Sequence, residues 1–307
     1  MYGTSVKSGS GIYRTYQIKK ELGCGKNRSV YMARHKRLRK HVVIKVINDC
    51  SVADIRIHRN EAEALKNVKS PYIPQIHDFV IENDHSFTVI EYIYGESFDK
   101  LIKKGNRFAE EQIIKWYAQL ASALGAIHIL DVCHRDIKPA NIILTEEDDI
   151  CLIDFDSAFV GSNDTGIISR SMGYASPEQY EFFKLCKGIS TDGSNQVFTD
   201  NEETGLVEND CKTMHVTEKG IVNGNKTNPI NWKLSDIYSL GATMYHVLTG
   251  KRPPVRPEDV ARIVRVQGYS SKLLQIIEKS MQSDPLNRFA SAKELENFLL
   301  SSAAEAT

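Results

Sequence analysis

The chain has 307 residues, with 39 Lys and Arg against 39 Asp and Glu, and 41% of its residues are hydrophobic. This length is sufficient for one large domain or for two lobes with a sizeable core. The balanced charge lacks the basic excess of a nucleic-acid binder, so no nucleic-acid partner is expected. No apolar run approaches the roughly 20 residues needed to span a bilayer, and the amino terminus does not follow the plan of a signal peptide. We therefore expect a cytoplasmic protein without a membrane segment.

The cysteines give no sign of a metal site or of disulfide bonds. They are scattered without a C-x-x-C pair, at positions Cys24, Cys50, Cys133, Cys151, Cys186 and Cys211. This distribution predicts neither a zinc site nor a disulfide framework. Most of these residues are expected to be buried as small apolar side chains.

The amino-terminal part of the chain has the pattern of a small β-rich lobe. Residues 1–12 are rich in Gly and Ser and are expected to form a flexible tail. Residues 13–94 begin with two strand-like runs around the glycine-bearing GCGKNR, followed by the β-branched strand HVVIKVI. The segment 54–68 has apolar residues at helical spacing and ends before Ser70-Pro71. Two further strand-like runs, IPQIHDFVI and SFTVIEYI, complete this lobe.

The composition then changes to helical patterns, which predict a larger second lobe over residues 95–301. Its candidate helices include EEQIIKWYAQLASALGAIHIL, SDIYSLGATMYHVLTG, SSKLLQIIEKSMQSD and SAKELENFLL. Residues 183–232 interrupt this lobe with a stretch rich in Asn, Thr, Gly and Glu, for which we expect a mobile insertion. Residues 302–307 form a short tail. The whole pattern predicts an α+β fold of two lobes.

Several polar residues of the β-rich lobe suggest a site that handles phosphates. Phosphoryl transfer requires a phosphate cradle, a cation, metal ligands and a base near the accepting hydroxyl. Gly23 and Gly25 lie between two strands, where backbone N–H groups can approach phosphates closely. Lys45 lies in the apolar run VVIK, where a buried ammonium needs an anion. Glu61 could pair with Lys45, although by itself it is better explained as a solvated charge on a helix.

The segment HRDIKPAN and the nearby LIDFD supply the remaining parts. Asp136 can accept the proton of a hydroxyl, and Lys138 can act as a second cation for the phosphates. Asn141 and Asp154 offer the hard oxygen ligands that magnesium prefers. Each of these residues alone could be structural, but chance does not readily produce all of them in this order.

Together these motifs resemble the eukaryotic-like (Hanks-type) Ser/Thr protein kinase family, from Tyr13 to Leu300, and most of all its bacterial members. LGCGKNRSV looks like the glycine-rich loop, VVIK like the strand of the nucleotide-binding Lys, and RNEAEALKNVKSPYI like the helix with its paired Glu. HRDIKPAN matches the catalytic loop of Ser/Thr kinases, and GYASPEQY looks like the end of the activation segment. The resemblance implies a bilobal protein-kinase-like fold, with an N-lobe over 13–94 and a C-lobe over 95–301.

The resemblance also implies roles for individual residues. The catalytic residues would be Asp136, Lys138, Lys45 and Glu61, and the ligands of Mg2+ or Mn2+ would be Asn141 and Asp154. The ATP site would be formed by Leu22, Gly23, Gly25, Val30, Val43, Lys45, Ile90, Glu91, Ile93 and Ile143. Ile90 would be the gatekeeper, and the backbone near Glu91 and Ile93 would bind adenine. Glu178 would pair with Arg288, and Asp236 would brace the catalytic loop.

Three positions depart from the pattern of the family. Arg28 replaces the third glycine of the loop, which can stiffen the loop tip and bring a cation to phosphate or to an acidic substrate. Asp156 replaces the glycine of the DFG motif, which adds negative charge near the metal while Asp154 is retained. Arg170-Ser171 replaces the usual Gly-Thr, and Ser171 keeps the hydroxyl.

These features predict a Ser/Thr protein kinase that transfers the γ-phosphoryl group of ATP to protein substrates and phosphorylates itself. Thr165, Ser169 and Ser171 are candidate phosphorylation sites, and Arg135 would be the cation that receives the phosphate. A nucleotide-binding pseudokinase scaffold is the alternative that the departures suggest. A small-molecule kinase fits less well, because such relatives generally lack the Lys of HRDIKPAN and the Pro-Glu of the activation segment. The sequence indicates neither the protein substrate nor the oligomeric state.

Overall fold

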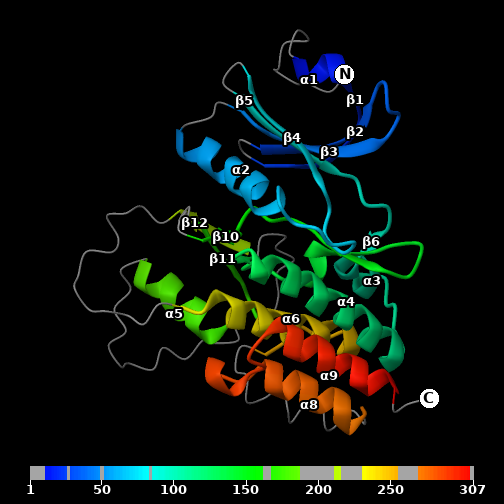
Figure 1. Cartoon of the computed structure of the whole chain (residues 1–307), viewed down its shortest axis with the longest axis vertical. Coiled ribbons are helices and arrows are strands. Elements are labelled where there is room, and N and C mark those ends of the chain that lie inside the picture. The colour runs from blue at the N-terminus through cyan, green and yellow to red at the C-terminus, as the bar shows by residue number, and fades with distance from the viewer. Residues whose placement is uncertain are drawn as a thin grey trace.

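The computed structural model describes residues 11–25, 28–48, 52–82, 85–161, 167–186, 211–215, 230–254 and 269–304. These residues form a β-rich lobe and a helical lobe, stacked along the long axis of the molecule (Figure 1). Residues 1–10 and 305–307 of the predicted tails and most of the predicted insertion lie outside the described residues. The expectation of a tail from residue 302 is wrong for residues 302–304, because they continue the last helix, α9 (Ala292–Ala304).

A five-stranded antiparallel sheet forms the first lobe, with the strand order β1-β2-β3-β5-β4. Its strands are β1 (Tyr16–Cys24), β2 (Arg28–His35), β3 (His41–Ile47), β4 (Ile76–Glu82) and β5 (His85–Glu91). They correspond to the strand-like runs of the sequence, because β-branched and aromatic residues favour the pleated backbone. In β3, Val42, Ile44 and Val46 pack into one apolar cluster, and the intervening Val43 and Lys45 point to the other face.

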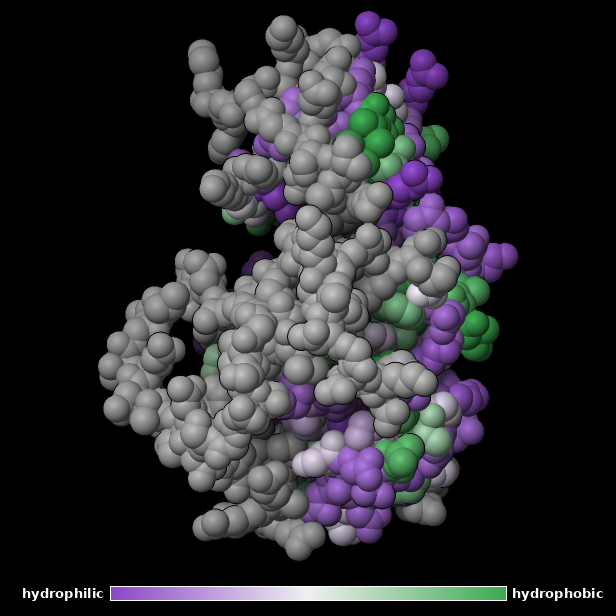
Figure 2. Space-filling view, turned by 90° about the vertical axis from the view of Figure 1, so that its left-hand side faces the viewer, coloured by the Kyte–Doolittle hydropathy of each residue, from purple (hydrophilic) through white to green (hydrophobic). Residues whose placement is uncertain are grey.

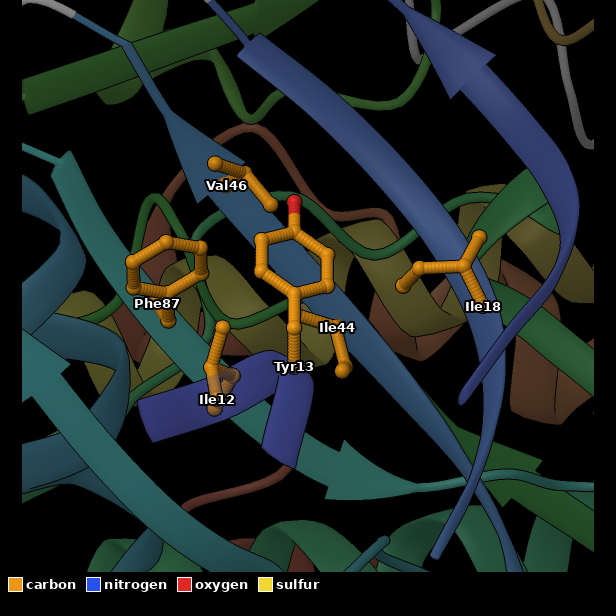
Figure 3. A pocket seen from close by; sticks show the side chains of 6 residues that line it. All are labelled: Ile12, Tyr13, Ile18, Ile44, Val46 and Phe87. Atoms are coloured by element: carbon orange, nitrogen blue, oxygen red, sulfur yellow. The ribbon is translucent and has the colours of Figure 1, made fainter. Parts of the chain in front are cut away.

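A short helix, α1 (Gly11–Thr15), covers the outer face of this sheet. Ile12 is 4% exposed, and the ring of Tyr13 lies edge-on to Phe87 with centroids 6.5 Å apart. The apolar pocket in Figure 3 is lined by Ile12, Tyr13, Ile18, Ile44, Val46 and Phe87. The expectation of a flexible tail through residue 12 is therefore wrong for its last two residues, because the apolar side chains of α1 are buried against the sheet.

The helix α2 (Val52–Leu65) lies beside the sheet and faces the second lobe (Figure 1). Ala64 and Leu65 belong to the large core that continues into the helical lobe. The helix agrees with the segment predicted from residue 54 onward, although its last regular residue is Leu65 rather than Val68. Its position brings Glu61 toward the junction of the lobes.

The second lobe is built from helices around one large core (Figure 1). These are α3 (Phe98–Lys103), α4 (Glu110–Ile129), α5 (Pro177–Cys186), α6 (Trp232–Thr249), α8 (Ser271–Ser280) and α9 (Ala292–Ala304), with short 3-10 helices η1 (Pro139–Asn141) and η3 (Pro285–Asn287). Most apolar positions of α4 are buried, as the helical spacing predicts, whereas Ile114 is partly buried and Ile129 is exposed. The helix α6 ends where Gly250 adopts a left-handed φ of 69°.

Short strands position the loops between the lobes. β6 (Glu96–Ser97), β8 (Ile142–Leu144) and β9 (Ile150–Leu152) form one small sheet, and β7 (Val132–Cys133) pairs with β10 (Phe159–Val160). Gly95 precedes β6 with a φ of 145°, and a Cβ there would lie 2.1 Å from the carbonyl oxygen of Leu144. Only glycine fits this close approach, at the point where the sequence predicts the lobe boundary.

The predicted insertion contributes regular structure at two places. The helix α5 continues to Cys186, and Phe183 is 1% exposed. Further along, β12 (Cys211–His215) pairs antiparallel with β11 (Ile167–Ser171). The expectation of a mobile insertion over residues 183–232 is thus wrong for these segments, since tertiary contacts give them a helix end and a paired strand.

In Figure 2, the coloured residues along one side of the face are mostly hydrophilic, with small separate apolar patches between them. Within the described part of the chain, no helix combines the length and the apolar character that a membrane crossing requires. Cys133 and Cys151 are buried and Cys24 is exposed, and all three are free thiols.

Candidate active site

Four residues predicted to surround a nucleotide lie on one face of the sheet. Val30 in β2 pairs with Lys45 in β3, and Val43 pairs with Ile90 in β5. Directly paired residues point to the same face, as do residues two apart along a strand. The apolar side chains of Val30, Val43 and Ile90 therefore flank Lys45 on the face away from α1.

The ammonium group of Lys45 is buried and contacts three carboxylates. Its Nζ lies 2.6 Å from Oε1 of Glu61, 2.8 Å from Oδ1 of Asp154 and 3.0 Å from Oδ1 of Asp156. Glu61 comes from α2, and both Asp residues come from the segment after β9. The predicted contact between Lys45 and Glu61 forms, because a buried ammonium needs a carboxylate partner. The contact with Asp156 was not predicted.

Burial and neighbouring charges change the protonation of this cluster. Burial lowers the pKa of Lys45, but Asp154, Asp156 and Glu61 outweigh it and raise the pKa above the usual value. Burial raises the pKa of Asp154, but Lys45 and Arg28 outweigh it and lower the pKa below the usual value. Burial also raises the pKa of Glu61, and the attraction of Lys45 only partly opposes this. Lys45 and Asp154 are therefore held in their charged forms.

The two residues that replace family glycines contact each other. Nη1 of Arg28 forms an ion pair with Oδ2 of Asp156, and Nη2 of Arg28 lies 3.6 Å from Oδ1 of Asp154. Their opposite charges, at two positions where glycine was expected, are the only signal in the sequence that could have indicated this pair. The structure thus adds a second cation to the cluster around Lys45.

The carboxylate of Asp136 is bonded on both oxygens. Oδ1 accepts a hydrogen bond from Oγ of Ser171 at 2.7 Å, and Oδ2 accepts one from Nζ of Lys138 at 2.7 Å. The same Nζ lies 3.2 Å from Oγ of Ser171, and Nδ2 of Asn141 donates to the carbonyl oxygen of Asp136 at 2.8 Å. The predicted base, the second cation and one predicted metal ligand are thereby brought together.

Asp236 holds the catalytic loop from the helix α6, as predicted. The side chain is fully buried, and its two oxygens accept the backbone N–H groups of His134 at 2.9 Å and of Arg135 at 2.8 Å. Nε2 of His128 lies 2.9 Å from the same carboxylate. These contacts fix the backbone immediately before Asp136.

The predicted metal ligands are linked through the backbone. The N–H group of Ile153 donates to the carbonyl oxygen of Asn141 at 2.9 Å, which places Asp154 next to the catalytic loop. Asn141 uses its amide nitrogen toward Asp136, so its side-chain oxygen is the atom that can meet a cation. Asp154 has a φ of 69°, and its side chain is 34% exposed. A carboxylate and an amide oxygen fit a hard divalent ion such as magnesium.

The remaining predicted nucleotide residues lie at the ends of strands. Leu22 is 43% exposed near the end of β1, and Gly23 pairs with Val30. The N–H group of Gly25 donates to the carbonyl oxygen of Arg28 at 2.6 Å, which closes the turn. Among the described atoms, a Cβ at Gly23 would meet nothing within 4 Å, so packing does not explain this glycine.

The predicted hinge and the predicted floor of the site come from different elements. Glu91 is the last residue of β5, and its N–H group donates to the carbonyl oxygen of Gln75 at 2.8 Å. Ile93 follows in the connection toward β6, and Ile143 lies in β8 of the second lobe. Their roles toward adenine stay predictions.

The structure changes the interpretation of two residues near the activation segment. Ser171 is 6% exposed and bonded to Asp136, so its hydroxyl is poorly accessible for phosphorylation. The same bond makes Ser171 part of the candidate active site. Arg135 is 1% exposed, donates to the carbonyl oxygen of Ser157 at 2.8 Å and stacks 5.0 Å from the ring of Trp232. Of the other candidate phosphorylation sites, Thr165 and the side chain of Ser169 lie outside the described residues.

Glu178 and Arg288 form the predicted ion pair. Nη1 and Nη2 of Arg288 bond Oε1 and Oε2 of Glu178 at 2.6 and 2.9 Å. The guanidinium is fully buried and also donates to the carbonyl oxygen of Leu234 at 2.9 Å. This bidentate pair ties α5 to the segment before α9 and supports the end of the activation segment.

Two lobes with a buried Lys among carboxylates at the sheet, and with a bonded Asp on the adjoining loop, have the arrangement that a nucleotide-dependent phosphotransferase requires. Comparison with protein families gives the more specific result, because the protein kinase domain matches residues 16–184, more than half of the chain. The chain therefore belongs to the protein kinase domain family, and the predicted bilobal α+β fold is confirmed.

Three relatives from bacteria match almost the whole chain. The chain is 27% identical to a probable serine/threonine-protein kinase of Clostridium acetobutylicum, over 94% of this chain and 40% of that protein. It is 27% identical to a probable serine/threonine-protein kinase of Clostridium perfringens, over 91% of this chain and 37% of that protein. It is 28% identical to the serine/threonine-protein kinase PknD of Mycobacterium tuberculosis, over 91% of this chain and 38% of that protein. The chain thus spans about two fifths of the length of these relatives.

Proposed function

We propose that this chain is a Ser/Thr protein kinase that transfers the γ-phosphoryl group of ATP to hydroxyl groups of protein substrates, its own included. One observation carries the proposal: an unbroken series of contacts joins the two halves of the site. Lys45 contacts Asp154, the residue before Asp154 bonds Asn141, and Asn141 bonds Asp136. A cation for phosphates, two metal ligands and a base are therefore held at fixed relative positions, which phosphoryl transfer requires.

Each of these residues has a role that follows from its charge and its contacts. Lys45, held by Glu61, binds phosphate oxygens through its ammonium group. Asp136 orients the attacking hydroxyl and accepts its proton, and Lys138 neutralises charge on the group that is transferred. The contacts of Asp136 with Lys138 and Ser171 keep the carboxylate in one orientation before substrate arrives.

Asn141 and Asp154 are the residues that would hold the divalent cation. Magnesium is the ion we expect, with manganese as a substitute, because both ligands are oxygen atoms. Such an ion supplies positive charge to the phosphates when it is bound. The surrounding protein contributes the orientation of its ligands, through the Lys45 contact to Asp154 and the Asp136 contact to Asn141.

Specificity for Ser and Thr, and for proteins rather than small molecules, rests on the second lobe. Lys138 is bonded to both Asp136 and Ser171, and a Lys two residues after the catalytic Asp is the position at which HRDIKPAN resembles Ser/Thr kinases rather than tyrosine kinases. The Glu178–Arg288 pair supports a protein-kinase type of activation segment. The names of the relatives support the same activity.

We also propose a cytoplasmic location, with which the three free cysteines of the described chain are consistent.

A nucleotide-binding scaffold without transfer is the second candidate. One observation favours it, since Oδ1 of Asp154 is contacted by Lys45 and approached by Arg28, which compete with a metal ion. The two candidates differ in turnover and not in binding, so that one assay separates them.

The test is transfer of labelled phosphate from ATP to the protein itself and to a peptide library, with magnesium or manganese, followed by phosphoamino acid analysis. Wild-type protein should label Ser or Thr. Asp136→Asn should lower transfer by roughly 100-fold or more and retain ATP binding, because only the proton acceptor is changed. The control Lys103→Met removes a charge at a side chain that is 76% exposed and should retain activity. ATP binding by the wild type without any transfer would favour the scaffold.

A further inference from the structure

The ion pair between Arg28 and Asp156 links the first residue of β2 to the segment that carries Asp154. The two residues replace glycines that lie far apart in the sequence, yet the fold places their opposite charges in contact. One such replacement alone would change the charge beside Lys45. Together they leave the charge balance unchanged, since one cation and one anion are added.

The cluster contains two cations, Lys45 and Arg28, and three carboxylates, Glu61, Asp154 and Asp156. Arg28 contacts two of these carboxylates, Asp154 and Asp156, and is therefore attracted by more negative charge than one ion pair requires. The phosphates of a nucleotide bring further negative charge to the same place, because Lys45 is their predicted ligand. A guanidinium in this position can exchange a carboxylate for phosphate oxygens, which match its planar fork equally well.

The two members of the pair differ in how firmly they are held. The side chain of Asp156 is 13% exposed, and its Oδ1 is bonded to Nζ of Lys45 at 3.0 Å. The side chain of Arg28 is 39% exposed, and both of its contacts to the cluster are ion pairs with Asp residues. Departure of Arg28 removes the cationic partner of the buried Oδ2 of Asp156, and contacts of the guanidinium with phosphate oxygens have to offset that cost. Arg28 is thus the member that a ligand can reach, whereas Asp156 is more buried and has a further bond to Lys45.

We propose that Arg28 is a phosphate-binding residue of the nucleotide site, held over Asp154 and Asp156 in the free protein and transferred to phosphate oxygens when the nucleotide binds. The inference rests on the proposed function, because it requires that the site around Lys45 binds a nucleotide. Asp156 is then a positioning residue, which keeps the guanidinium near the phosphates and competes with them for it. Arg28 is then a second cationic side chain, beside Lys45, that binds the phosphates of the nucleotide.

Binding of ATP and of adenosine to the full chain tests this assignment, with calorimetry as the measurement and EDTA present to exclude metal ions. Adenosine lacks phosphates, so the ratio of the two affinities reports contacts with phosphate. Arg28→Gln should lower the affinity for ATP by about tenfold, the effect of one charge-assisted hydrogen bond, and leave the affinity for adenosine unchanged. Arg28→Lys should retain part of the ratio, because it keeps the charge. Arg37→Gln, at an exposed position of the β2–β3 turn, is the matched control.

The variant Asp156→Asn distinguishes competition from a structural pair. If Asp156 competes with phosphate for Arg28, its removal raises the ratio of ATP to adenosine affinity, whereas Arg28→Gln lowers it. Loss of either half of a purely structural pair would move the affinity in the same direction. Equal ratios in wild type and Arg28→Gln, or parallel losses in both variants, would overturn the inference alone. A wild type that binds neither ligand, with or without magnesium, would overturn the nucleotide site as well.

Discussion

Substitution of Asp236 by Asn tests whether the fold of the second lobe holds the catalytic loop. Asp236 accepts two backbone N–H groups, from His134 and Arg135, and lies beside Nε2 of His128. An Asn side chain has one oxygen, so in either orientation its NH2 group faces one of these backbone N–H groups. A buried donor without an acceptor costs about 1 to 3 kcal/mol, and the remaining bonds lose their charge assistance at about 1 kcal/mol. We expect the free energy of unfolding to fall by about 3 kcal/mol.

Urea unfolding followed by circular dichroism measures this change, and phosphate transfer measured on the same samples reports on the loop. Transfer should also fall, because the backbone before Asp136 loses its support. The control is Asp131→Asn, which removes the same charge at a side chain that is 65% exposed and should change stability by less than about 0.5 kcal/mol. Superimposable unfolding curves for the two variants would refute the reasoning, because the buried carboxylate of Asp236 would then contribute no more to stability than the exposed one of Asp131.

Other substitutions test the packing of the second lobe and its response to pH. Burial lowers the pKa of His246 from 6.5 to about 4 in the folded protein, so the unfolded chain binds the proton more tightly. The free energy of unfolding should therefore fall by about 1 to 3 kcal/mol as the pH drops from 6.5 to 4. Urea unfolding at several pH values should show a flatter dependence for His246→Gln, and an unchanged slope would contradict this. Gly241→Ala should lower stability by about 1 to 3 kcal/mol, because its Cβ would lie 2.6 Å from Cβ of Ser280 between α6 and α8. In α4, a Cβ at Gly125 would meet nothing within 4 Å among the described atoms, so Gly125→Ala should raise stability by up to about 1 kcal/mol in thermal unfolding. Equal effects of the two substitutions on stability would exclude the packing argument.

Several contacts of the site could be predicted because a buried charged side chain requires a partner of opposite charge. Lys45 in an apolar strand requires a carboxylate, and Glu61 on the next helix supplies it at 2.6 Å. The buried Arg288 likewise requires an anion and finds Glu178. In both cases the resemblance named the partner, and the cost of an unpaired buried charge explains why the contact forms.

The contacts that were missed join segments whose positions no local pattern specifies. Ser171 was interpreted as a candidate for phosphorylation, yet it is bonded to Asp136 and buried. Asp156 was expected only to add negative charge, yet it binds Lys45 and Arg28. Neither contact follows from hydrophobic periodicity, because loop positions depend on the packing of both lobes around them.

The amino-acid sequence by itself determined the five strands of the first lobe, the long helices, the division near Gly95 and the set of charged residues available to the site. Periodicity, turn residues and backbone preferences act over a few neighbouring residues, and they are readable without the fold. Only the tertiary structure decided that Arg28 meets Asp156, that Ser171 reaches Asp136 and that β12 pairs with β11. These contacts join distant segments, and their formation depends on how the lobes pack, because ion pairs and hydrogen bonds act only at short range.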